Sequence, residues 1–267
     1  MKNAQLYYWA IVIAFSLGWF IHRQYQTSPP LPDPSPQAFQ IPKISQHRWR
    51  QPLQAFNTPY LEQNNNLHRY MGKYSFSDSI FLSDDRLAWS AEEFLWLEKI
   101  SKEENPASGL QIKVDTASLM TGRVNDKERA YIPAFIYNET LSDKFLIGMR
   151  WEPWSILEAK APDGQWYPIQ YYRPYDCATD MGYLKIAPQE FCVLSLPLFI
   201  GDYSTELRLR IDTGKQVLRS HTFKGRINKT QFEFSPINPI GQMLKGIPEQ
   251  WRRKYFLGSS PMVLNRN

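Results

Sequence analysis

The stretch ELRLRI at residues 206–211 alternates apolar and charged side chains, and the turn sequence DTGK at 212–215 follows it. A second alternating run, Gln216 to Phe223, comes directly after the turn. A period of two is typical of a strand with one buried face, and a short connection containing glycine joins antiparallel neighbours. Residues 206–223 are therefore predicted to form a β-hairpin.

Similar short runs precede this hairpin, at spacings of roughly ten residues. Pro162-Asp163-Gly164 separates two of them and predicts a second hairpin. Eight or nine such runs with turn signals between them are typical of an antiparallel β-sandwich, although the Cys…Trp…Cys spacing of antibody domains is missing. We expect a mainly β fold with an immunoglobulin-like sandwich over residues 109–235. Its other runs are Leu110–Thr116, Ala130–Tyr137, Phe145–Trp151, Ser155–Ala161, Gln165–Tyr172, Gly182–Ile186 and Phe191–Leu198.

The N-terminus carries a membrane-anchor signal. Leu6 to Ile21 is a run of sixteen residues without a charge, with Ser16 as its one clearly polar side chain. As a helix it is about 24 Å long, and snorkelling of Lys2 and Arg23 extends it toward the bilayer core of about 30 Å. We predict an uncleaved transmembrane anchor over residues 1–23. A cleaved signal peptide, which lacks a good cleavage site here, and a buried core helix are the alternatives.

A proline-rich linker follows, over residues 24–43. Six prolines lie between Pro29 and Pro42, which excludes a helix or a central strand. As a semi-rigid polyproline spacer, the fourteen residues from Pro29 to Pro42 span up to about 40 Å. A proline-rich ligand for a partner domain is the alternative interpretation.

Residues 44–108 show no sustained period and are interpreted as loop with short helical pieces, packed on the main domain. One helix is marked more clearly, because Ser90 and Glu93 have the capping-box spacing and Phe94, Leu97 and Ile100 follow near helical spacing.

The chain has two cysteines, Cys177 and Cys192, with fourteen residues between them. A disulfide closing that loop is worth about 3 kcal/mol. Two cysteines behind an export-competent N-terminus favour this disulfide and place the body in the periplasm or outside the cell. The alternative is a buried hydrophobic Cys192 with an incidental thiol at Cys177. Asn138-Glu139-Thr140 and Asn228-Lys229-Thr230 are glycosylation sequons, which matter only in a eukaryotic secretory route.

Local motifs for catalysis or cofactor binding are missing from the sequence. The four histidines, at 22, 47, 68 and 221, show no metal-ligand spacing, and His221 is interpreted as structural. His68, Ser79 and Asp84 or Asp85 could be combined into a catalytic triad, but any chain of this length contains such a set of residues, and the triad is disfavoured. We expect no cofactor and no metal, and an enzyme is disfavoured, although a site assembled from distant segments would show no local motif.

Aromatic residues make up 15% of the chain and gather between Trp151 and Tyr175. Neighbouring strand positions point to opposite faces, so some rings are expected on the surface. Trp154, Trp166 and Tyr171 are candidates for contact with a protein partner, or for stacking on a glycan. Ordinary core packing is the competing interpretation.

The C-terminal segment, residues 236–267, is predicted to be a basic amphipathic tail. Apolar residues from Ile240 to Tyr255 recur at spacings of three and four, with Gly246 and Pro248 dividing two helices. Five basic residues against one acidic residue account for most of the chain's net charge of +5. Such a tail suits an anionic membrane or an acidic partner, or it packs back on the sandwich. Its candidate contact residues are Trp251, Arg252, Arg253 and Tyr255.

Together these signals predict a non-catalytic, single-pass membrane protein that presents a β-sandwich outside the cytoplasm. The expected role is docking or scaffolding in a cell-envelope assembly, with another envelope protein as partner. A membrane-tethered glycan-binding module is the alternative. Nucleic-acid binding is discounted because the positive charge is local and the chain is expected to be exported.

Overall fold

The computed structural model describes residues 37–45, 54–63, 68–81, 94–96, 107–124, 127–149, 152–172, 181–237 and 239–262. The chain divides into two compact units, Met1–Gln37 and Ala38–Asn267, and the fold below is that of the second. The predicted anchor and most of the proline-rich linker lie outside the described residues. Within the described ranges, no helix has the length and apolar character needed to cross a bilayer.

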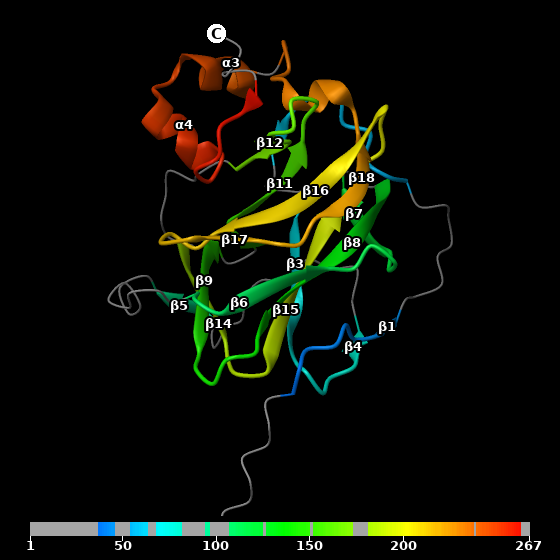
Figure 1. The fold of residues 1–267 in the computed structure, drawn as a ribbon, viewed down its shortest axis with the longest axis vertical. Helices are drawn as coiled ribbons and strands as arrows, with labels where there is room; N and C mark the ends of the chain where they lie inside the picture. The colour runs from blue at the N-terminus through cyan, green and yellow to red at the C-terminus, as the bar shows by residue number, and fades with distance from the viewer. Residues whose placement is uncertain are drawn as a thin grey trace, which may run out of the picture. The chain divides into compact units, whose positions relative to one another are not determined.

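The second unit is mainly β, with antiparallel sheets and few helices (Figure 1). Its first sheet has the order β3-β15-β8-β6, and β7 also pairs with β8. The strands of this sheet are β3 (Arg69–Ser75), β6 (Leu110–Val114), β7 (Met120–Val124), β8 (Lys127–Asn138) and β15 (Glu190–Pro197).

Two further antiparallel sheets complete the body. The second sheet has the order β10-β9-β14-β5, from β5 (Phe94–Trp96), β9 (Lys144–Met149), β10 (Glu152–Pro153) and β14 (Met181–Ile186). The third has the order β12-β11-β16-β17, with β18 also paired to β16. Its strands are β11 (Ser155–Lys160), β12 (Trp166–Pro168), β16 (Tyr203–Asp212), β17 (Val217–Arg219) and β18 (Phe223–Ile227).

Two short parallel ladders lie beside these sheets. One joins β1 (Ile44–Ser45) to β4 (Ile80–Phe81), and the other joins β2 (Glu62–Gln63) to β13 (Gln170–Tyr171).

All three antiparallel sheets contribute to one main hydrophobic core, which gives the unit a β-sandwich-like organisation. On β16 the alternation predicted from the sequence is present: Leu207, Leu209 and Ile211 are buried in this core. The side chains of Arg208 and Arg210 therefore lie on the opposite, outer face of the third sheet.

Both predicted hairpins are confirmed. β11 and β12 pair around Gly164, and β16 and β17 pair around Gly214. The two glycines have φ of +81° and +79°, a left-handed conformation that suits glycine.

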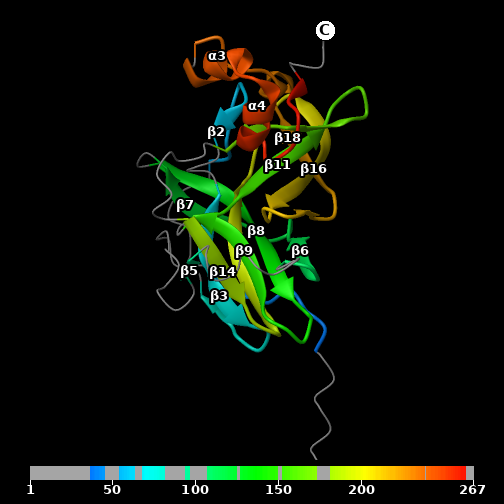
Figure 2. The ribbon, with the colours of Figure 1, turned by 90° about the vertical axis from the view of Figure 1, so that its left-hand side faces the viewer.

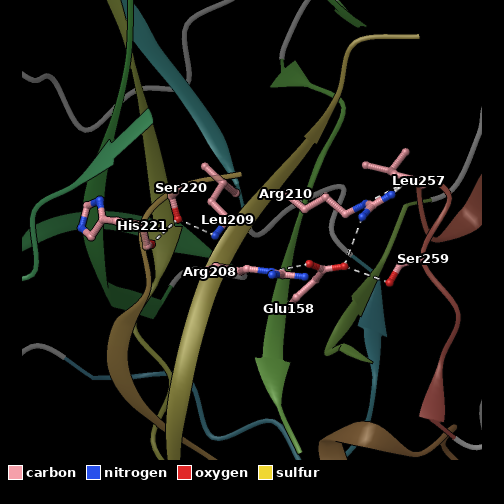
Figure 3. A network of polar contacts seen from close by, with 8 residues as sticks. All are labelled: Glu158, Arg208, Leu209, Arg210, Ser220, His221, Leu257 and Ser259. Carbon is pink, nitrogen blue, oxygen red and sulfur yellow. Dashed lines mark hydrogen bonds and ion pairs between the residues drawn. The ribbon is translucent and has the colours of Figure 1, made fainter. Parts of the chain in front are cut away.

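The second hairpin is interrupted by a bulge that the sequence did not indicate. Three residues, 220–222, lie opposite Arg208 and Leu209, so the predicted run 216–223 divides into β17 and β18. The Ser220 hydroxyl accepts the Leu209 N–H at 2.9 Å and donates to the His221 carbonyl (Figure 3). The exposed His221 is thus on a structural bulge.

Two predictions for residues 44–108 are wrong. Residues 69–75 are a strand, β3, where loop and helical pieces were expected, and 94–96 are a strand, β5, within the expected capping-box helix. In both cases pairing with a distant strand, β15 or β14, overrides the weak local pattern.

The two predicted C-terminal helices are confirmed as α3 (Pro239–Gly246) and α4 (Glu249–Tyr255), after the short 3₁₀ helix η3 (Lys229–Phe232). Leu244 and Phe256 are buried against Leu61, Tyr171 and Phe234 in a second, smaller hydrophobic cluster. The alternative in which the tail packs back on the sandwich is therefore correct for these side chains. Figures 1 and 2 place α3 and α4 at one end of the unit and residues 38–45 at the other.

Candidate functional site

The three aromatic residues proposed from the sandwich lie in different surroundings. Trp154 is half-buried between β10 and β11. Trp166 begins β12, half-buried, with the Arg208 guanidinium 4.2 Å above its ring. Tyr171 is only 2% exposed and packs against Phe256 in the smaller cluster. Its ring is not on the surface, which corrects the expectation that Tyr171 contacts a partner.

Among the tail candidates, Trp251 is exposed, at 52%, and Lys254 lies 4.2 Å over its ring. Tyr255 is half-buried, and its carbonyl accepts the Tyr172 N–H at 2.6 Å. Arg252 and Arg253 lie on α4, and their side chains are outside the described part of the chain.

Trp154 and α4 meet at a pocket of about 410 Å³. The pocket joins the ends of the second and third sheets to the C-terminal segment, and Trp166 does not line it. Its lining residues are Met149, Trp154, Tyr172, Met181, Asp212, Gly214, Lys254 and Leu257.

The wall of the pocket is mostly apolar. Met149 and Met181 are directly paired across β9 and β14. The backbone N–H of Trp154 donates to the Ile147 carbonyl at 3.3 Å, and the backbone carbonyl of Trp154 accepts the Asp212 N–H at 2.9 Å. Both sheets therefore hold the backbone of this residue in place. Two methionines beside aromatic rings form an adaptable surface that suits apolar ligands of varied shape.

Three polar groups stand in this apolar wall. Burial raises the pKa of the Asp212 carboxyl, while the hydrogen bond from Gly214 N–H (2.8 Å) and the charge of Arg210 act against this rise. The Trp154 Nε1 atom is buried and has no hydrogen-bond partner among the described residues. Lys254, exposed at the rim, supplies an ammonium group.

A buried polar network holds the C-terminal side of the pocket (Figure 3). The Glu158 carboxylate accepts hydrogen bonds from Arg208 Nε at 2.7 Å and from Ser259 Oγ at 2.9 Å, and lies 3.5 Å from Arg210 Nη1. Arg210 donates from Nε and Nη2 to the Leu257 carbonyl, at 2.9 and 2.7 Å. Burial lowers the pKa of the Arg210 guanidinium, and the neighbouring Glu158 carboxylate opposes this.

His68 belongs to a separate, buried polar group. Its Nδ1 lies 2.8 Å from Ser155 Oγ, and burial lowers the pKa of the imidazole to about 3. The nearby Gln170 side chain acts to raise the pKa of His68, in opposition to burial. The Gln170 Nε2 atom has no hydrogen-bond partner among the described residues. A neutral, fully buried imidazole without access to solvent is a structural group. In the part of the chain that the structure covers, no three His, Cys, Asp or Glu side chains gather as a metal site requires.

The proposed disulfide falls partly outside the described residues. Cys192 is buried on β15 in the main core, whereas Cys177 belongs to the undescribed residues 173–180. The pairing of the two cysteines stays a prediction.

Both glycosylation sequons have structural uses. Asn138 is fully buried: its Nδ2 donates to the carbonyls of Ser142 and Ile186, each at 2.9 Å, and its Oδ1 accepts two bonds from Thr140. Asn228 Nδ2 donates to Asn57 Oδ1 and to the Thr58 carbonyl, each at 2.8 Å. The amide nitrogen that would carry a glycan is therefore occupied in both sequons.

When the protein is secreted from a eukaryotic host, we expect the folded product to carry no glycan on Asn138. Peptide mapping by mass spectrometry measures this. The matched control is the double variant Asp163→Asn with Gln165→Thr, which creates a sequon on the exposed β11–β12 turn and should be glycosylated. A glycan on Asn138 in protein of wild-type melting temperature would contradict the buried position of this side chain.

The sequence indicates Trp154 and the segment that forms α4, which includes Lys254, but it does not indicate Asp212, Met149, Met181 or Leu257. These residues come from segments far apart in the chain, and none belongs to a local motif. Asp212 was read only as the first residue of a turn. The pocket has to be interpreted from its own chemistry, because no protein-family model, no curated protein and no solved structure shows a significant match to this chain.

Proposed function

We propose that this chain is a non-catalytic, single-pass membrane protein that serves as a docking or scaffolding component of a cell-envelope assembly. Leu6–Ile21 anchors it, the proline-rich residues 24–43 act as a spacer, and an immunoglobulin-like sandwich is held outside the cytoplasm. The apolar N-terminal run, the six prolines behind it and the antiparallel β body support this proposal.

One observation carries the docking role: large apolar side chains are exposed on the two C-terminal helices and just before them. Ile237, Met243 and Trp251 are exposed at 89%, 44% and 52%. Exposed lysines, Lys245 and Lys254, accompany them. Tryptophan and methionine are enriched in protein interfaces, and exposed apolar side chains in one short segment of chain favour such an interface. This end of the unit is opposite to the end that holds residues 38–45 (Figure 1).

A protein partner is favoured over a glycan. Stacking on a sugar needs an open ring face, and the indoles of Trp166 and Trp251 each have a cation over one of their two faces. Arg208 lies over Trp166, and Lys254 lies over Trp251, each at 4.2 Å from the ring centre. Cation-covered indoles suit a polar-rimmed protein interface.

The test is the double variant Trp251→Ala with Met243→Ala in the full-length chain. A protein that co-purifies with the wild type from detergent-solubilised membranes should be depleted by about thirtyfold or more, because truncation of an interface tryptophan costs about 2 kcal/mol or more. The melting temperature should stay nearly unchanged, since both side chains are largely exposed.

Leu141→Ala is the matched control, because Leu141 is 84% exposed and lies away from the C-terminal helices. It should retain both the partner and the melting temperature. Equal recovery of the partner with the double variant would reject the C-terminal helices as the docking surface.

A further inference from the structure

We propose that the pocket formed by Trp154, Asp212 and Lys254 binds a peptide segment of a partner protein, holding one large apolar side chain and the peptide amide next to it. This inference rests on the proposed docking function and names the chemistry that the site recognises. The volume of the pocket, its apolar wall and three polar groups that are not paired with one another support it.

The size and lining of the pocket suit an apolar side chain larger than alanine. A volume of about 410 Å³ accommodates an aromatic ring together with part of a backbone. Met149 and Met181 line one wall, and Trp154 and Tyr172 line another. Gly214 and Lys254 are exposed at the rim, so an extended chain can enter the pocket from solvent.

The Trp154 indole nitrogen points to an acceptor on the ligand. Its Nε1 atom is buried and unpartnered among the described residues, whereas a buried tryptophan N–H usually finds a hydrogen-bond partner. Because Nε1 itself is enclosed, a peptide carbonyl in the pocket would reach this donor after a small rotation of the half-buried indole, which breaks no hydrogen bond of Nε1 to the described residues.

Asp212 and Lys254 supply the complementary groups. The Asp212 carboxylate takes one hydrogen bond, from Gly214 N–H, and retains further acceptor capacity. The Lys254 ammonium lies over the Trp251 ring, and it forms no ion pair with Asp212 although both line the same pocket. A peptide group offers an N–H to the carboxylate and a carbonyl to a donor, so its two polar atoms complement the acceptor and the donors that line the pocket.

The probe is N-acetyl-phenylalaninamide, which carries one aromatic side chain between two amides. The full-length chain is labelled with ¹⁵N at the indole nitrogens of its nine tryptophans, and the Trp154 resonance is assigned with Trp154→Phe. We expect a saturable downfield shift of the Trp154 N–H signal, with a dissociation constant of about 1 mM, as is typical of so small a ligand. N-acetyl-glycinamide, which lacks the side chain, should produce no shift at the same concentrations.

Two methionine variants form a matched pair. Met181→Phe replaces a flexible, adaptable side chain of the wall with a rigid and larger ring, and should weaken binding by about tenfold or more because the wall can no longer adapt to the ring of the probe. Met243→Phe makes the same change on α3, away from the pocket, and should leave binding unchanged.

The absence of a Trp154 shift up to about 20 mM probe, an equal shift with the glycine amide, or binding of free phenylalanine alone would each overturn the proposal. The last result would identify a site for free amino acids. The two failures are distinguishable. If the double variant Trp251→Ala with Met243→Ala still recovers the partner while the probe still shifts the Trp154 signal, the docking surface is rejected and the pocket is retained.

Discussion

Glu158→Gln is expected to lower the free energy of unfolding by about 3–5 kcal/mol, which is the cost of breaking a buried ion pair by removing one partner. Glu158 is almost completely buried and faces two arginines, Arg208 and Arg210. Arg210 is itself buried, and burial already lowers the pKa of its guanidinium. Without the carboxylate, this cation would stay buried beside Arg208 with no opposite charge from Glu158.

Glu206→Gln is the matched control for this experiment. Glu206 lies on the neighbouring strand and pairs with Lys160 at 3.0 Å, but both side chains are nearly half exposed. Such a surface pair contributes about 0–1 kcal/mol, and salt screens it. Urea unfolding of both variants measures the difference. A loss of less than about 1 kcal/mol for Glu158→Gln would show that the network adds no net stability.

The same substitution should loosen the C-terminal segment. Ser259 binds the Glu158 carboxylate, and the Leu257 carbonyl accepts two bonds from Arg210, so the network attaches the end of the chain to the outer face of the third sheet. Hydrogen exchange of the amides after α4 should therefore accelerate more in Glu158→Gln than in Glu206→Gln.

The sequence predicts those parts of the fold in which local pattern and tertiary contact agree. β16 is an example, because alternate positions bury Leu207 and Leu209 and a glycine turn follows the strand. β3 and β5 were missed because their pairing with β15 and β14 is non-local and their own residues show no clear period. The bulge at Ser220 was missed for a related reason: a hydroxyl takes the place of a backbone acceptor, which no periodicity reveals.

The candidate site was only half predictable. Exposed aromatics and a basic tail pointed to Trp154 and α4, which the structure brings to one pocket. The prediction for Tyr171 was wrong because alternation along a strand indicates which face of the sheet a side chain is on, but not whether another element covers that face. Here the C-terminal helical segment covers the face that holds the Tyr171 ring. Asp212 could not be recognised, since its burial depends on Trp154 and on the C-terminal segment, which are distant in sequence.

Acid is expected to destabilise the protein through His68, because its folded imidazole has a pKa of about 3 instead of 6.5. Between these two values the unfolded chain binds more protons than the folded chain, so stability is present above pH 6.5 and is lost as the pH falls. From pH 7 to pH 5 the loss amounts to about 2 kcal/mol, and each further unit toward pH 3 adds about 1.4 kcal/mol. Burial lowers the pKa of His68, because the ring is fully enclosed beside Ser155 and its protonated form would lack hydration by water.

His68→Gln should remove this dependence, so that its stability curve is flatter than that of the wild type between pH 7 and 5. Asp212 acts in the opposite direction, because its raised pKa favours the folded state as the pH falls toward 3.8. The informative quantity is therefore the difference between variant and wild type, measured by urea unfolding at each pH. His221→Gln, at the exposed bulge, should keep the wild-type steepness. Parallel curves for His68→Gln and the wild type would mean that the imidazole is charged in the folded protein at no cost, which contradicts its burial.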